Sequence, residues 1–75
     1  MDTALDIKAS AKKLIELRGE KSQKEVADAL GISVSALSMY ENGERIPRDN
    51  IKIRLANYYQ KPIGEIFFIT KTHVT

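Results

Sequence analysis

Residues 23–42 read QKEVADALGISVSALSMYEN, and this stretch decides how the chain folds. Apolar residues recur at helical spacing on both sides of a glycine: Val26, Ala27 and Leu30 precede Gly31, and Leu37 and Tyr40 follow it. Gly31 comes directly after the last apolar residue of the first segment, where helices commonly end in a left-handed backbone that glycine adopts at low cost. The stretch therefore predicts two short helices joined by a tight turn.

Two helices joined in this way form a helix-turn-helix, whose second helix reads the major groove of duplex DNA. The small side chain of Ala27 is expected where the two helices cross, so it lets them approach closely. The outward residues of the second helix are small or uncharged: Val34, Ser35, Ser38 and Met39. Such a surface suits close approach to base edges in a groove about 12 Å wide.

Capping residues set the boundaries of the first three predicted helices. Apolar residues at helical spacing predict a helix over about residues 5–18, and Gly19 ends it. Ser22 is a natural N-cap for the second helix, with Glu25 three residues on completing a capping box. Ser33 is the expected N-cap of the third.

Two further helices and a tail complete the chain. Asp49 is expected to cap a fourth helix, and Pro62 suits the first turn of a fifth. The tail, from about residue 69 to 75, is rich in β-branched residues and could be a short strand or disordered. The pattern predicts one all-α domain over residues 1–75.

Composition limits the classes of function that remain open. The chain has 75 residues, no cysteine and a net charge of +2, so a disulfide framework and a thiolate metal site are excluded. No apolar run approaches the ~18–20 residues of a membrane span, and Met1-Asp2-Thr3 has no basic region typical of a secretory signal. His73 is the only histidine, and no nucleophile–base pattern is visible. We therefore expect no enzyme activity, metal or cofactor.

Basic residues are unevenly distributed. They outnumber acidic residues between Lys8 and Lys24, and again between Arg45 and Arg54. These two clusters flank the predicted helix-turn-helix in sequence. They fit a polyanionic partner, and they fit equally well the ordinary solvated faces of helices.

The sequence resembles the Cro/cI-like (XRE) helix-turn-helix family of phage repressors and small bacterial regulators, over about residues 8–68. The matching residues include Gln23, Val26-Ala27, Leu30-Gly31-Ile32, Leu37-Ser38, Tyr40-Glu41-Asn42-Gly43, Pro47 and Ile66-Phe67. The resemblance implies a five-helix lambda-repressor-like domain with its helix-turn-helix at residues 23–42 and the third helix in the major groove. It implies double-stranded DNA as the partner and the cytoplasm as the location, with no small-molecule ligand.

The resemblance also implies roles for individual side chains. The positions that face base edges are Val34, Ser35 and Met39, with Ser38 close by. The positions that contact DNA phosphates are Gln23, Asn42 and Arg48, with Arg45 a further candidate. Gln23 would also brace the reading helix. The family pattern further implies an ion pair between Arg18 and Glu41, although the connection from Arg18 to Gln23 is shorter than in common members.

The reading helix departs from the family pattern in one respect. Val34 stands where family members often have glutamine or arginine, and residues 33–42 contain no lysine or arginine. Specificity would then rest on serine hydrogen bonds, contacts with thymine methyl groups, and DNA shape. We expect modest affinity for each monomer.

The C-terminal third of the chain suggests how two copies associate. Its apolar and aromatic residues exceed what a small core can bury, so Ile66, Phe67, Phe68 and Ile69 are candidate dimer contacts. Alternatively, Phe68 and Ile69 fold back and the protein is monomeric. A two-fold dimer would set two reading helices about 34 Å apart on an inverted repeat. The sequence thus favours a repressor, and the alternative is a protein–protein module of antirepressor or antitoxin type.

Overall fold

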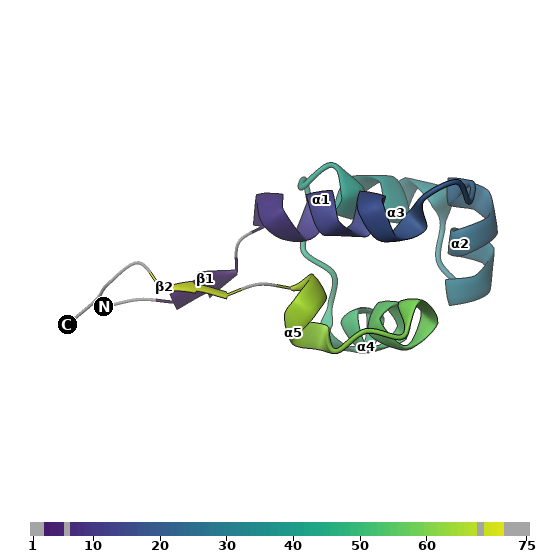
Figure 1. Cartoon of the computed structure of the whole chain (residues 1–75). Coiled ribbons are helices and arrows are strands. Elements are labelled where there is room, and N and C mark those ends of the chain that lie inside the picture. The colour runs from purple at the N-terminus through teal and green to yellow at the C-terminus, as the bar shows by residue number, and fades with distance from the viewer. Residues whose placement is uncertain (1–2, 6, 68, 72–75) are drawn as a thin grey trace.

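The computed structural model of the chain describes residues 3–5, 7–67 and 69–71. This part of the chain forms a helical body and a two-stranded ribbon (Figure 1). The helices are α1 (Ile7–Arg18), α2 (Gln23–Leu30), α3 (Val34–Glu41), α4 (Asp49–Tyr59) and α5 (Ile63–Ile66), and the strands are β1 (Thr3–Leu5) and β2 (Ile69–Lys71). The predicted five-helix body is confirmed, and the ribbon is an addition to it.

The turn between α2 and α3 forms as its residues predict. Ser22 has an extended backbone, and its Oγ accepts a hydrogen bond of 3.0 Å from the backbone N–H of Glu25. Gly31 has a φ of 70° and ends α2 in the left-handed conformation. The Oγ of Ser33 then accepts a hydrogen bond of 3.0 Å from the N–H of Ala36 and starts α3. Local sequence therefore sets both ends of the turn, because each cap satisfies a backbone group that the helix leaves unpaired.

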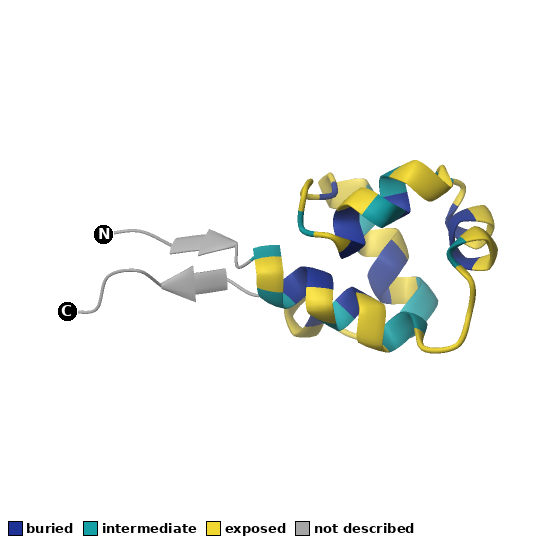
Figure 2. Ribbon diagram, turned by 90° about the horizontal axis from the view of Figure 1, so that it is seen from above, coloured by how far each residue is buried: buried dark blue, intermediate teal, exposed yellow. Residues whose placement is uncertain are grey.

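Every helix contributes side chains to one continuous core (Figure 2). Its buried members are Leu14, Val26, Ala27, Leu30, Leu37, Tyr40, Leu55, Ala56, Ile66 and Phe67. Ala27 is fully buried, and α2 packs against α3. Because Ala27 is fully buried, a larger side chain at this position would have no free volume to occupy.

Two helix starts differ from prediction by one residue. Arg48, not Asp49, is the N-cap of α4, because Arg48 keeps the extended backbone that follows Pro47. Asp49 is instead the first residue of α4, where a carboxylate favours the positive end of the helix dipole. Pro62 likewise is the residue before α5 and does not lie within its first turn.

The strands β1 and β2 pair in an antiparallel ribbon. Thr3 pairs with Lys71, Ala4 with Thr70, and Leu5 with Ile69. The strand alternative for the tail is therefore correct over residues 69–71, while residues 72–75 lie outside the described part. The N-terminal strand was not predicted, and it explains why α1 starts at Ile7 and not near residue 5. Figure 1 shows the ribbon projecting from the end of the body that lies away from α2.

Candidate nucleic-acid interface

One side of α3 faces the core and the other faces solvent. Leu37 and Tyr40 are buried, whereas Val34 and Met39 are 41% and 37% exposed. Ser35 is exposed and Ser38 is half-buried. The side chains predicted to face base edges thus lie on the outer surface of α3, although a contact with DNA remains a prediction.

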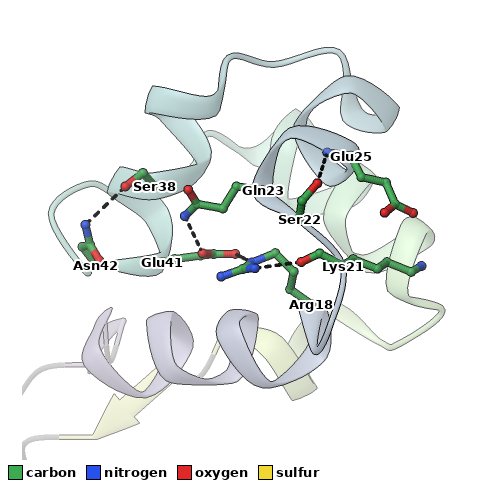
Figure 3. Close-up of polar contacts among 8 residues, drawn as sticks. All are labelled: Arg18, Lys21, Ser22, Gln23, Glu25, Ser38, Glu41 and Asn42. Carbon is green, nitrogen blue, oxygen red and sulfur yellow. Dashed lines mark hydrogen bonds and ion pairs between the residues drawn. The ribbon is translucent and has the colours of Figure 1, made fainter.

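A buried carboxylate fixes the C-terminal end of α3. Glu41 is the last residue of the helix and only 3% exposed. Arg18 Nε donates to its Oε2 at 2.7 Å, and Gln23 Nε2 donates to its Oε1 at 2.9 Å (Figure 3). A carboxylate without partners would be costly to bury in this position, and these two donors compensate that cost.

Arg18 connects three segments through its guanidinium. It ends α1, pairs with Glu41 at the end of α3, and donates from Nη1 to the carbonyl oxygen of Lys21 at 2.8 Å. The hydrogen bond to the Glu41 carboxylate raises the pKa of Arg18 above its ordinary value. The ion pair that the family resemblance implies therefore forms despite the short connection between α1 and α2. The same guanidinium also stabilises that connection through its hydrogen bond to Lys21.

Gln23 occupies the first position of α2 and braces α3 through Glu41. This confirms the bracing role. The amide nitrogen carries a second hydrogen that can donate to a phosphate oxygen. The phosphate contact itself stays a prediction.

Asn42 and Ser38 lie one helical turn apart and contact each other. The Asn42 Nδ2 lies 3.4 Å from Ser38 Oγ, a long hydrogen bond (Figure 3). The structure thereby brings a predicted phosphate-binding residue next to a predicted base-reading residue. The Asn42 amide nitrogen carries a second hydrogen, which can donate to a phosphate oxygen.

Arg45 and Arg48 lie in the segment between α3 and α4, and both are exposed. Pro47 between them is buried and anchors the segment. Among the described residues, no ion pair involves Arg45 or Arg48. Their charges therefore remain available for a polyanion.

Two residues of α4 support this site although the sequence did not predict them to do so. Arg54, counted above within a basic cluster, donates from Nη1 to the carbonyl of Leu30 at 3.2 Å and so secures the C-terminal end of α2. Tyr59 has a buried hydroxyl, and its burial, reinforced by the negative charge of Glu41, raises the pKa of Tyr59 to about 12. Neither role has a local signal, because both depend on how α4 packs across the body.

The burial pattern corrects part of the dimer prediction. Ile66 and Phe67 are 0% and 4% exposed within a single chain, where they complete the core. They have no surface left for a partner, which counts against both as dimer contacts. The side chains of Phe68 and Ile69 lie outside the described residues.

The described residues contain no cluster of histidine, cysteine, aspartate or glutamate side chains that could hold a metal ion. None of the helices in the described segments is long and apolar enough to cross a membrane.

Comparison with known proteins identifies the family. A helix-turn-helix family model matches residues 12–66, from α1 to the end of α5. The chain belongs to the Cro/cI-like (XRE) helix-turn-helix family, and it is a DNA-binding transcription regulator. This family is a regulatory domain family and not an enzyme family. Comparisons with curated proteins and with solved structures gave no match.

Proposed function

We propose that the protein is a cytoplasmic repressor that binds an inverted-repeat operator as a homodimer, through a single domain spanning residues 1–75. The observation that carries the proposal is the outer face of α3, held in place by the Arg18–Glu41–Gln23 network. A reading helix must be rigid before it meets DNA, because loose side chains lose entropy on binding. No cofactor or small-molecule ligand enters this mechanism.

In this proposal, one set of side chains reads bases and another set binds phosphates. Val34, Ser35, Ser38 and Met39 would read bases, with Val34 and Met39 against thymine methyl groups and the serines donating or accepting hydrogen bonds. Gln23, Asn42, Arg45 and Arg48 would bind phosphates. Since α3 carries no charged side chain except the buried Glu41, phosphate contacts must supply most of the affinity.

The direct test selects bound sequences from random duplex DNA and then measures binding to the selected site in increasing salt. We expect an inverted repeat, and an affinity that falls steeply with salt while the sequence preference persists. Binding that never exceeds the level for unrelated DNA at low salt contradicts the proposal.

A second candidate function is a protein–protein module of antirepressor or antitoxin type. It is favoured by large apolar side chains that are exposed outside α3: Ile15, Ile46, Ile53 and Ile63. The double substitution Ser35→Ala with Arg48→Ala separates the two candidates, because both side chains are exposed and neither belongs to the Arg18–Glu41–Gln23 network. A regulatory output that survives this double substitution in cells favours the protein–protein module, and an output that is lost favours the repressor.

A further inference from the structure

We propose that the peptide bond between Asn42 and Gly43 is a site of spontaneous deamidation, and that the carboxylate formed there lowers the affinity of the protein for DNA. Asn42 is exposed at the C-terminal end of α3, and Gly43 follows it in the connection to α4. The reaction needs no enzyme and no reactant besides water. Its effect on DNA binding rests on the proposed function, whereas the chemistry itself does not.

Deamidation joins the side chain of an asparagine to the backbone that follows it. The Gly43 nitrogen loses its proton and attacks Cγ of Asn42, and the Nδ2 group takes up a proton and leaves as ammonia. The product is a five-membered succinimide ring. Water then adds to one of the two ring carbonyls and breaks its bond to nitrogen, which leaves either aspartate or isoaspartate at position 42. The neutral amide is thereby replaced by a carboxylate, which is charged at neutral pH.

Glycine is the residue that hinders this attack least. It has no side chain to shield the attacking nitrogen or to restrict the backbone after the asparagine. The fold favours glycine at this position for a separate reason, because Gly43 has a φ of 74°, in the left-handed region. The cap that ends α3 therefore places the most reactive neighbour directly after Asn42.

The folded backbone slows the reaction without preventing it. Asn42 has a helical ψ of −3°, and the Gly43 N–H donates to the carbonyl oxygen of Tyr40 at 3.3 Å. A second bond, from the N–H of Glu44 to the carbonyl oxygen of Met39 at 2.9 Å, closes the cap. Ring closure needs rotation about this ψ, so both bonds have to open first. Backbone bonds at exposed helix ends open more readily than those of the core, and the opening of the cap sets the rate.

The Asn42 side chain can turn toward the backbone once the cap has opened. Its Nδ2 donates to Ser38 Oγ over 3.4 Å, which is long for a hydrogen bond and easily broken (Figure 3). The reacting carbon therefore belongs to a side chain that is held only weakly.

The chain carries its own controls for this reaction. Asn50 and Asn57 are its other asparagines, and both lie within α4. The residues that follow them are an isoleucine and a tyrosine, whose side chains crowd the backbone nitrogen that would have to attack. Their amides should therefore persist where that of Asn42 is lost.

A carboxylate at position 42 opposes DNA binding in two ways. Asn42 is proposed to donate a hydrogen bond to a phosphate, and a negative charge in its place repels the phosphate. The C-terminal end of a helix also carries a partial negative charge, so a carboxylate at this cap destabilises the end of α3. Isoaspartate adds a methylene group to the main chain and disturbs the cap further. Deamidated molecules should therefore bind the operator more weakly.

The site is tested by incubating the full chain in warm, mildly alkaline buffer and measuring amide loss at each asparagine by peptide mapping and mass spectrometry. We expect Asn42 to convert at least about tenfold faster than Asn50 or Asn57, because glycine alone leaves the attacking nitrogen unshielded. Conversion should be faster still in urea, where the cap is open. A conversion of Asn42 no faster than that of the other two asparagines overturns the proposal.

DNA binding before and after incubation tests the consequence, with circular dichroism to check that the helices remain. We expect incubated wild type and fresh Asn42→Asp to bind the operator about tenfold more weakly than fresh wild type. Asn42→Gln is the matched control, since its longer side chain would have to close a six-membered ring, and it should keep the affinity of its own fresh sample. Wild type that has converted at position 42 and still binds as tightly as before overturns the second part of the proposal. If fresh wild type prefers no DNA sequence, the proposed function fails and the deamidation site stands.

Discussion

The Nε atom of Arg18 lies 2.7 Å from Oε2 of Glu41, and this ion pair joins the last residue of α1 to the last residue of α3. The carboxylate is buried, and its two donors, Arg18 and Gln23, compensate the cost of removing it from water (Figure 3). The pair thereby links the scaffold helix to the helix that is proposed to read DNA. The pair positions the two helices relative to each other as much as it stabilises the fold, since buried ion pairs often add little net stability.

Replacing Glu41 with glutamine should destabilise the fold. The change keeps the shape of the side chain, but it leaves the Arg18 guanidinium without its counter-charge in a largely buried setting. We expect a loss of about 2 kcal/mol in the free energy of unfolding, measured by urea denaturation. Glu16→Gln is the control, since Glu16 is exposed and lies 4.0 Å from Lys13. Equal effects of the two substitutions would show that burial of the Glu41 pair is unimportant.

Ionisation of Tyr59 should make stability fall at high pH. Burial raises its pKa to about 12 from an ordinary value of 10.0, so the folded state holds the proton more tightly than the unfolded state. The resulting stabilisation is complete below pH 10 and is lost as the pH rises through about 12. Relative to Tyr59→Phe, the wild type should lose about 1–2 kcal/mol across this window. Tyrosinate absorbance measured against pH supplies an independent check, and titration of Tyr59 at its ordinary value would contradict the prediction.

Enlarging Ala27 should force α2 and α3 apart. Ala27 is fully buried in α2, which packs against α3, so Ala27→Leu should cost about 1–3 kcal/mol through overpacking and should weaken operator binding further if it shifts α3. Ala29→Leu adds the same side chain on the exposed side of α2 and serves as the control. Thermal unfolding and DNA titration measure the two effects. Unchanged operator affinity in Ala27→Leu would show that the angle between the helices is not critical.

Replacing Gly31 should strain the turn. With a φ of 70°, Gly31→Ala forces a Cβ atom into the left-handed region at a cost of about 1 kcal/mol or more. The strain comes from the backbone, since the nearest atom to the new Cβ is the Arg54 Nη1 at 3.8 Å. Gly64→Ala is the opposite case, because its Cβ would meet nothing within 4 Å and Gly64 lies in α5. That change should stabilise the protein by about 0.5–1 kcal/mol in the same denaturation experiment.

Removing the Arg48 charge should weaken DNA binding without changing sequence preference. If Arg48 binds a phosphate, Arg48→Ala lowers the affinity for all DNA sequences alike. It also reduces the slope of log affinity against log salt concentration by about one. Lys61→Ala removes an exposed charge beyond the end of α4 and is the matched control. Fluorescence anisotropy on operator and unrelated DNA measures both. A loss confined to the operator would reassign Arg48 to base reading.

Local features of the chain were predictable because their causes are local. Ser22, Gly31 and Ser33 act on backbone groups within a few residues of themselves, and the structure places all three as expected. The Arg18–Glu41 ion pair and the bracing of the reading helix by Gln23 were predictable only through the family resemblance, and the structure adds that Gln23 acts through Glu41.

Other features of the fold could not be predicted from the sequence, because they depend on contacts between distant segments. A strand as short as β1 has no periodicity of its own, and it exists because β2 returns beside it. The sequence shows Arg54 only as one member of a basic cluster and gives Tyr59 no particular role. Packing of α4 brings Arg54 to the end of α2 and Tyr59 within reach of the charge of Glu41. Ile66 and Phe67 look equally suited to a core or an interface, and only the finished packing assigns them to the core.

The sequence by itself determined the helix-turn-helix, its caps and its glycine turn, and the family to which the chain belongs. These rest on residue types at short spacings, where propensity and hydrogen bonding act directly. Tertiary structure alone decided which aromatic residues fill the core, which α4 side chains support the reading helix, and that β1 and β2 pair in a ribbon. Those outcomes depend on segments distant in sequence competing for the same buried volume and the same backbone partners, and that competition is resolved only when the whole chain has packed.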